Sequence, residues 1–374
     1  MSNVDESKTI FTSNGASIYW LQKDPQNHLD KTTLIFGGSG SGKTTIIDEL
    51  LYQLKDYIPN FLVIAPRTSD TTYRKKLPSR CIKEDLTKRK LQQIWDRQYN
   101  VTQLYNTAND LNVLEGLFKR RPDRETYVML TAIKKRAGEV INEIENKKEL
   151  DFAQKKSQKI AIEELLNKRI KTLYKTFITK YKSILETLDL TPHERIAVEY
   201  AELNPRFCLI IDDCSEKFQS WMKYFKKGEI NPFESIFYKG RWNYLTLIFA
   251  AHDDKLVNPE LRKNARVTIF TNSQALVASI NKAGNGFTSK DKKEAMEYAS
   301  RIFSEEKLGV KTHQKLCYVR EDIHPFRYTI ANLYPDFTLG CYSLRDLVSK
   351  LPKKDDNLKS NPFVKELFKK DKFD

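Results

Sequence analysis

The feature that constrains this chain most is the glycine-rich stretch LIFGGSGSGKTT over residues 34–45. It fits the Walker A pattern GxxxxGK[ST] and lies between an apolar run and a helical pattern. Glycines let successive backbone N–H groups turn towards phosphate oxygens, and a helix N-terminus adds a partial positive charge. A flexible glycine–serine turn is the alternative, which the pattern and its context together disfavour. The stretch therefore predicts a nucleotide-phosphate site.

Each part of this stretch has an expected role. Lys43 contacts the β and γ phosphates, the Thr44 hydroxyl binds Mg²⁺, and Thr45 reaches the α phosphate. The expected ligands are ATP and Mg²⁺. The predicted phosphate-binding residues are Gly37, Gly38, Ser39, Gly40, Ser41, Gly42, Lys43, Thr44 and Thr45.

Short apolar runs with little alternation recur along the chain, as is typical of strands covered on both faces. A helical pattern over residues 45–57 follows the first run, which makes a βαβ unit. The runs that predict parallel strands span residues 33–36, 61–65, 207–211, 244–251 and 267–270, and two further candidate strands span 315–319 and 326–330. The sequence thus predicts an α/β fold with a mostly parallel sheet.

Between residues 83 and 202 the strand-like runs disappear, and lysine, arginine and glutamate dominate. Apolar residues step by threes and fours from Ile162 to Leu188, which predicts one face of a long helix. The outer lysines either contact nucleic acid or a neighbouring subunit, or form a solvated face; both remain open. The expected organisation is a discontinuous core over 1–82 and 203–345, an inserted helical region over 83–202, and a basic, loosely ordered tail over 346–374.

Two aspartates end the apolar run FCLIIDD at residues 207–213. A magnesium nucleotide site needs a carboxylate at the end of a neighbouring strand. We assign Asp212 to the metal and Asp213 to orienting or deprotonating the attacking water. Aspartates at strand ends often only begin a turn, so this assignment depends on the accompanying Walker A stretch.

The apolar run at residues 247–251 ends in His252. A histidine at this place can donate to the γ phosphate or position water. The alternative is a side chain that caps the next turn together with Asp253 and Asp254.

Three arginines flank this region and are candidates for a finger that stabilises charge in a neighbouring subunit's site. Arg241 precedes the run at 244–251, and Arg262 and Arg266 follow it. Most surface arginines have no such role, so the sequence does not choose among them.

The composition favours an anionic partner. The formal net charge is +15, and nucleic acid fits better than a membrane because no basic amphipathic anchor stands out; a lysine-rich solubility surface is the alternative. Five cysteines without a CxxC pair suggest neither a disulfide framework nor a zinc module. No apolar run approaches the length of a membrane span, and the N-terminus MSNVDESK lacks the regions of a signal peptide. We expect an intracellular, non-secreted protein.

The loop GGSGSGKT, the strand FCLIIDD and the segment YLTLIFAAHDDKLVNPELRKNARVTIFTN occur in this order. Together they resemble the genome-packaging ATPases of nucleocytoplasmic large DNA viruses, of the poxvirus type within the HerA and FtsK group. The resemblance covers roughly residues 30–75 and 203–275. It implies a RecA-like ASCE sheet and a homo-oligomeric ring, pentameric or hexameric, that threads double-stranded DNA. It also implies capsid or portal partners and a location at the virus assembly site in the host cytoplasm, or in the virion.

Two residues depart from the pattern of that family. Asp213 stands where the family usually has a glutamate, which is one methylene longer, so the water must lie closer or Glu216 must help. His252 stands where the family usually has a glutamine.

The leading hypothesis is an ATP-driven DNA translocase that fills a viral capsid. A small-molecule or nucleoside kinase would share the phosphate loop, but no short arginine-rich lid is evident. A GTPase is disfavoured because the fragment NKAG at residues 281–284 lacks the aspartate that binds guanine. The non-enzyme alternative is an assembly or scaffold protein that is stabilised by bound nucleotide.

Overall fold

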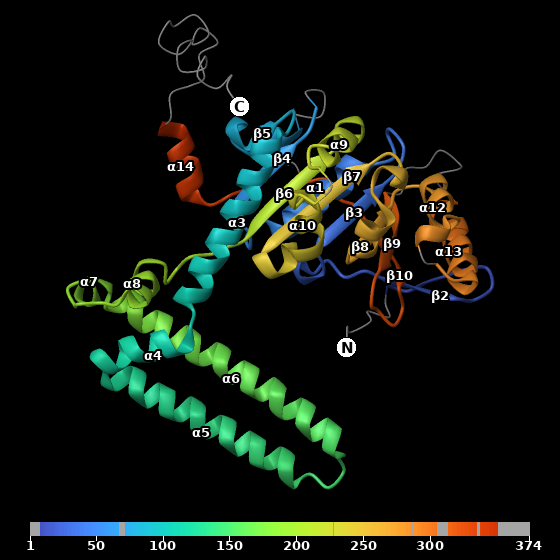
Figure 1. Ribbon diagram of the computed structural model, residues 1–374. Coiled ribbons are helices and arrows are strands. Elements are labelled where there is room, and N and C mark those ends of the chain that lie inside the picture. Colours follow the sequence, from blue (N-terminus) through green and yellow to red (C-terminus); the bar gives the residue numbers. More distant parts are fainter. Residues whose placement is uncertain are drawn as a thin grey trace, which may run out of the picture. The chain divides into compact units, whose positions relative to one another are not determined.

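The computed structural model describes residues 8–66, 72–226, 228–285, 287–304, 313–334 and 337–350. The chain divides into two compact units, drawn in Figure 1: a first unit of Met1–Gln92 and Arg206–Asp374, and a second unit of Gln93–Pro205. Helix α3 (Lys88–Ala108) begins in the first unit and continues into the second. The second unit overlaps the inserted helical region that we expected over residues 83–202, but it begins at Gln93 and ends at Pro205.

The first unit is built on a sheet whose strands have the order β1-β2-β10-β9-β8-β3-β7-β6-β4-β5. The strands are β1 (Ile10–Phe11), β2 (Ser17–Trp20), β3 (Thr32–Phe36), β4 (Asn60–Ile64), β5 (Ile82–Lys83), β6 (Phe207–Asp212), β7 (Leu245–Ala251), β8 (Val267–Phe270), β9 (Gln314–Val319) and β10 (Phe326–Ile330). From β8 to β5 every neighbouring pair is parallel, whereas β9 is antiparallel to both β8 and β10. All seven strands predicted from apolar runs are present.

The order of the central strands confirms the predicted α/β fold. β3, which precedes the glycine-rich stretch, lies between β7 and β8, and Leu34 pairs with Phe249 on one side and Thr268 on the other. β6, which ends in Asp212, lies beyond β7. The separation of these two strands by a third is the arrangement expected of a RecA-like ASCE sheet. It also brings the carboxyl ends of β3, β7 and β6 to one edge, where ligands bind in such sheets.

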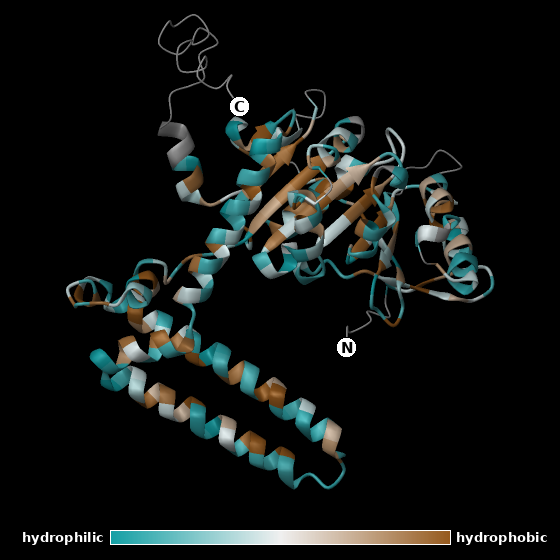
Figure 2. Ribbon diagram, in the orientation of Figure 1, coloured by the Kyte–Doolittle hydropathy of each residue, from teal (hydrophilic) through white to brown (hydrophobic). Residues whose placement is uncertain are grey.

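The central strands are apolar because they are buried along their whole length. Every residue of β3, β6 and β7 is buried, and Figure 2 shows much of these strands in the brown of hydrophobic residues. Helix α1 packs on them through Ile46, Ile47 and Leu50, in one core with Ile35 and Ile248. The helices of this unit are α1 (Lys43–Leu54), α9 (Ser215–Met222), α10 (Pro232–Lys239), α11 (Pro259–Lys263), α12 (Ser273–Ile280), α13 (Ser289–Ile302) and α14 (Tyr342–Lys350).

The second unit is helical. It contains α4 (Leu111–Arg120), α5 (Arg124–Asn146), α6 (Phe152–Lys180), α7 (Lys182–Leu185) and α8 (Pro192–Glu199). α5 and α6 lie side by side as a hairpin (Figure 1). The start of each is fixed by an aspartate N-cap: Asp123 accepts from the Thr126 N–H, and Asp151 forms a capping box with Gln154.

The prediction of one long helix through Leu188 was wrong at its C-terminal end. α6 ends at Lys180, and Tyr181 leaves the helical conformation with φ −111° and ψ 17°. The turn carries Leu185 of α7 into the same core as Phe177 and Ile178, so apolar spacing continues while the helix does not.

The C-terminal part differs from the expected tail at its beginning. α14 covers residues 342–350, so the first residues of the segment 346–374 are helical; the rest of that segment lies outside the described residues. Across the described part of the chain, no helix combines the length and apolar character needed to cross a membrane.

Candidate nucleotide site

The glycine-rich stretch forms the turn from β3 into α1. Gly42 is the N-cap of α1 and has φ 89°, a left-handed conformation that glycine adopts without steric cost. The helix begins at Lys43, so its N-terminal backbone N–H groups and partial positive charge lie at the loop. Ser39 and Gly40 are exposed at the loop. This arrangement is that of a phosphate-binding loop.

The base of the loop is closely packed against the end of β8. A Cβ atom at Gly37 would overlap the Thr271 hydroxyl and lie 2.5 Å from Ser41 Oγ, so no larger residue fits there. Ser41 Oγ donates to the Gly38 carbonyl at 2.8 Å and lies 2.5 Å from Thr271 Oγ1. The loop shape is therefore set by a neighbouring strand as well as by its own glycines.

Lys43 is turned back over the loop. Its ammonium donates to the carbonyl oxygens of Gly37 at 2.8 Å and Gly38 at 2.9 Å, and the residue is only 7% exposed. Burial lowers the pKa of Lys43 below its usual value, although the charges of Asp213 and Asp212 oppose this shift. Phosphate oxygens form stronger charge-assisted bonds to an ammonium than peptide carbonyls do. The side chain is thus held where it can exchange carbonyls for a phosphate.

Asp212 lies at the end of β6 and is 2% exposed. The Tyr73 hydroxyl donates to its Oδ2 at 2.8 Å. Burial raises the pKa of Asp212; the hydrogen bond from Tyr73 opposes the rise, and the neighbouring charge of Asp213 adds to it. Tyr73 was not found from the sequence, because it belongs to no strand run or motif. Its hydroxyl fixes the orientation of the carboxylate assigned to the metal.

Asp213 and His252 form a pair beside Lys43. His252 Nε2 lies 2.5 Å from Asp213 Oδ1, and His252 Nδ1 lies 3.3 Å from Lys43 Nζ. The lysine ammonium has only donors, so Nδ1 must accept and the imidazole proton must lie on Nε2, where it donates to Asp213. Asp213 also has φ 53°, a conformation that is uncommon outside glycine and occurs at functional sites. The three side chains form one hydrogen-bonded series.

The residues assigned to Mg²⁺ fit that ion. Thr44 is exposed in the first turn of α1, and Asp212 follows a strand whose carboxyl end lies at the same sheet edge. Within the described ranges, no group of three or more histidine, cysteine or acidic side chains could hold a metal. Mg²⁺ in nucleotide sites is bound by one or two protein groups together with substrate phosphates and water, and Thr44 and Asp212 are suited to be those protein groups.

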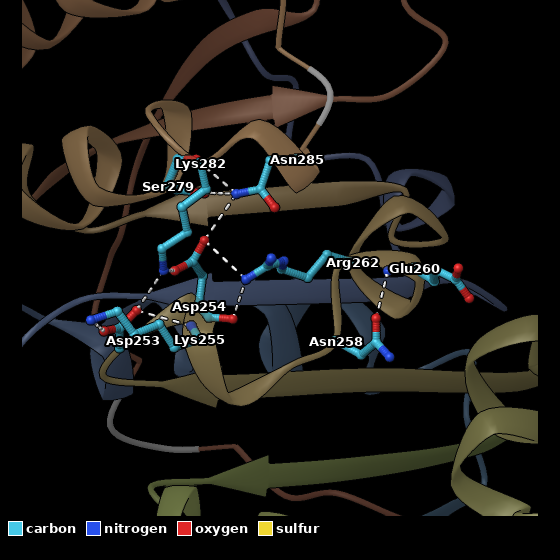
Figure 3. Close-up of polar contacts among 9 residues, drawn as sticks. All are labelled: Asp253, Asp254, Lys255, Asn258, Glu260, Arg262, Ser279, Lys282 and Asn285. Atoms are coloured by element: carbon cyan, nitrogen blue, oxygen red, sulfur yellow. Dashed lines mark hydrogen bonds and ion pairs between the residues drawn. The ribbon is translucent and has the colours of Figure 1, made fainter.

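Arg262, one of the three finger candidates, is buried and paired within its own chain. It is 8% exposed, and its guanidinium lies 3.1 Å from Asp254 Oδ2 and also donates to the Asp254 carbonyl. Figure 3 shows that Lys282 and Asn285 bind the same carboxylate. Asp254, in the segment that follows His252, therefore joins α11 to the region after α12.

The other candidates have different surroundings. Arg241 is exposed in the 3₁₀ turn η4 (Gly240–Asn243) before β7, with its guanidinium 4.6 Å from the centre of the Trp242 ring. Arg266 lies 3.3 Å from Glu321 Oε2. Arg241 precedes β7 and Arg266 precedes β8, and both strands are parallel to β3. The two arginines therefore lie at the amino-end edge of the sheet, opposite to the phosphate loop of the same chain. Glu216 belongs to α9, and its side chain lies outside the described residues.

No family model matches the chain. Similar proteins are the "Uncharacterized protein B354L" of African swine fever virus from a Kenyan pig isolate and from a Namibian warthog isolate. Each is 29% identical to this chain, and each match covers 95% of this chain and 97% of the viral protein. They are therefore similar over nearly their full length.

Two solved structures show distant similarity. The genome-packaging NTPase B204 of Sulfolobus turreted icosahedral virus 2, in complex with ATP-gammaS, is 12% identical with a TM-score of 0.33, covering 82% of this chain and 98% of its own. The pCW3 conjugation coupling protein TcpA, with ATPgS, is 11% identical with a TM-score of 0.36. The match covers 89% of this chain and 67% of TcpA. Because these identities and TM-scores are low, the function is inferred from the candidate site of this chain and not from these structures.

Proposed function

We propose that this protein is an ATPase that drives double-stranded DNA translocation and packages a viral genome into its capsid. The observation that carries the proposal is the set of side chains gathered at one edge of the sheet. There a buried Walker A lysine, Lys43, is linked through His252 to Asp213, beside the buried Asp212. A loop that only binds phosphate does not require such a series, whereas hydrolysis requires a group that holds water.

The geometry supports a division of roles. Lys43 binds the β and γ phosphates, and Asp213 orients a water molecule whose oxygen attacks the γ phosphorus as the bond to the β–γ bridging oxygen breaks. The water proton passes to Asp213 or to an oxygen of the γ phosphate, and ADP and inorganic phosphate are released. His252 keeps the Asp213 carboxylate directed towards the phosphate loop. Mg²⁺, bound by Thr44 and through water by Asp212, would offset phosphate charge.

Three features support DNA as the molecule that the protein moves and a virus as its setting. The net charge of +15 favours a polyanion. The full-length relatives are viral proteins. The order of the motifs resembles that of packaging ATPases, and accordingly we propose a pentameric or hexameric ring, capsid or portal partners, and action at the virus assembly site.

The test is steady-state ATP hydrolysis with Mg²⁺, with and without long double-stranded DNA, at low and moderate salt. We expect DNA to raise the rate several-fold, and added salt to weaken this stimulation because phosphate contacts release counterions. Nucleotide binding without turnover would instead indicate a scaffold. Turnover that is indifferent to DNA would indicate a different NTPase.

A further inference from the structure

A cavity lies in the first unit, at the opposite edge of the sheet from the phosphate loop. Its volume is about 540 Å³, and it is lined by residues that immediately precede β3 and β8, by α10 and η4, and by the turn after β9. Because β3 and β8 are parallel, their amino ends meet here while their carboxyl ends meet at the phosphate loop. A cavity of this size accommodates a ligand as large as a nucleoside phosphate.

The lining is strongly cationic. Five basic side chains face two acidic ones, Asp30 and Glu321. Asp30 is already paired with Arg206 at 3.1 Å, and Glu321 is 78% exposed. The five cations are Lys31, Arg241, Lys263, Arg266 and Arg320. The acids therefore leave an excess of positive charge around the cavity.

The fold holds some of these cations through backbone carbonyls. Arg266 donates to the Arg320 carbonyl, and Arg320 Nε donates to the Ala265 carbonyl at 3.4 Å. Lys31 donates to the Gln26 carbonyl. A carbonyl orients a cation without neutralising it, so the charges of Lys31 and Arg320 stay available to an anion, whereas Arg266 is also paired with Glu321 at 3.3 Å. Burial and the nearby charge of Arg266 lower the pKa of Lys31, whereas the charges of Asp24 and Asp30 oppose this shift.

The rim of this cavity also carries aromatic surface. Tyr238 lines it, and Arg241 lies over the Trp242 ring, which is 62% exposed. Arginine and lysine bind phosphate oxygens whatever the base sequence, and exposed aromatic rings pack against sugars and bases. The combination suits a phosphodiester with its attached nucleoside.

We propose that this cationic cavity binds the phosphate backbone of a DNA strand. The proposal rests on the proposed function, since it takes DNA as the partner and names the surface that contacts it. It places DNA contact and ATP hydrolysis at opposite edges of one sheet, so that β3 and β8 connect the two sites directly. The cavity would recognise phosphate groups, which a free nucleotide or pyrophosphate also carries. These small anions are therefore the alternative ligands.

The test compares two pairs of substitutions that remove the same charge. Lys31→Gln with Lys263→Gln alters the cavity, and Lys290→Gln with Lys293→Gln alters α13 on the same unit. Binding of a fluorescent duplex is measured by anisotropy without nucleotide over a series of salt concentrations, and thermal melting checks that each variant is folded. We expect the cavity variant to raise the duplex Kd about tenfold and to reduce the salt slope by about 2, with little change in the control.

The outcomes separate this proposal from the proposed function. A wild-type protein that does not bind duplex overturns both. A wild-type protein that binds duplex, with equal losses in the two variants, overturns the cavity proposal alone, since general surface charge then explains binding. Calorimetry with inorganic pyrophosphate, on protein that carries Lys43→Ala to disable the phosphate loop, covers the other source. If the cavity variant loses pyrophosphate but not duplex, the site is for a free anion and the DNA proposal fails.

Discussion

Replacing Lys43 by alanine is expected to lower the rate of ATP hydrolysis by on the order of 10²- to 10³-fold or more, because the variant loses the charge that contacts the β and γ phosphates. It should also weaken nucleotide binding. The measurement is steady-state phosphate release at saturating Mg²⁺ and ATP, together with binding of a fluorescent ATP analogue. Lys55→Ala, at the far end of the same helix, is the matched control and should behave as wild type.

The variant should remain folded, because Lys43 makes its protein contacts with loop carbonyls and one histidine and has no buried carboxylate partner among the described residues. Its melting temperature without nucleotide checks this. A folded Lys43→Ala protein with unchanged turnover would remove the Walker A loop from the account.

Replacing Asp213 by asparagine is expected to leave ATP binding intact and to reduce hydrolysis by about 10²- to 10⁴-fold, the usual contribution of a positioned general base. Asparagine has nearly the same size, tolerates the left-handed backbone with φ 53°, and can still accept from His252 Nε2. The substitution therefore removes the negative charge and little else. Single-turnover hydrolysis, measured beside binding, separates the two effects.

The companion substitution is Glu216→Gln, since Glu216 is the alternative acid for the same water. We expect it to retain most of the activity. If Asp213→Asn hydrolyses ATP normally while Glu216→Gln does not, the catalytic base has been assigned to the wrong residue, although the nucleotide site would stand.

The parts of the fold that could be predicted from sequence are those that leave a local pattern. Strands such as β6 and β7 are buried on both faces, so they read as unbroken apolar runs. The phosphate loop carries its own glycines, lysine and threonines. The sequence also placed Asp213 and His252 each at the end of a strand, but it did not pair their side chains, which only the structure shows.

What could not be predicted depends on contacts between distant segments. Nothing in the sequence around Arg262 indicates that it pairs with Asp254, or that Lys282 binds the same carboxylate. Nor does any motif place the hydroxyl of Tyr73 on Asp212. The end of α6 was misplaced because apolar spacing continues beyond Tyr181. Periodicity reports which residues face a core, but it does not report where the chain turns.

The most direct test of the central claim is displacement of a third strand from a triplex by the purified protein. A labelled oligonucleotide is bound to one end of a long duplex, and its release is followed after addition of Mg²⁺ and ATP. The account predicts release with ATP, and none with a non-hydrolysable analogue or with Lys43→Ala protein. A protein that hydrolyses ATP on this DNA yet leaves the third strand in place would contradict translocation.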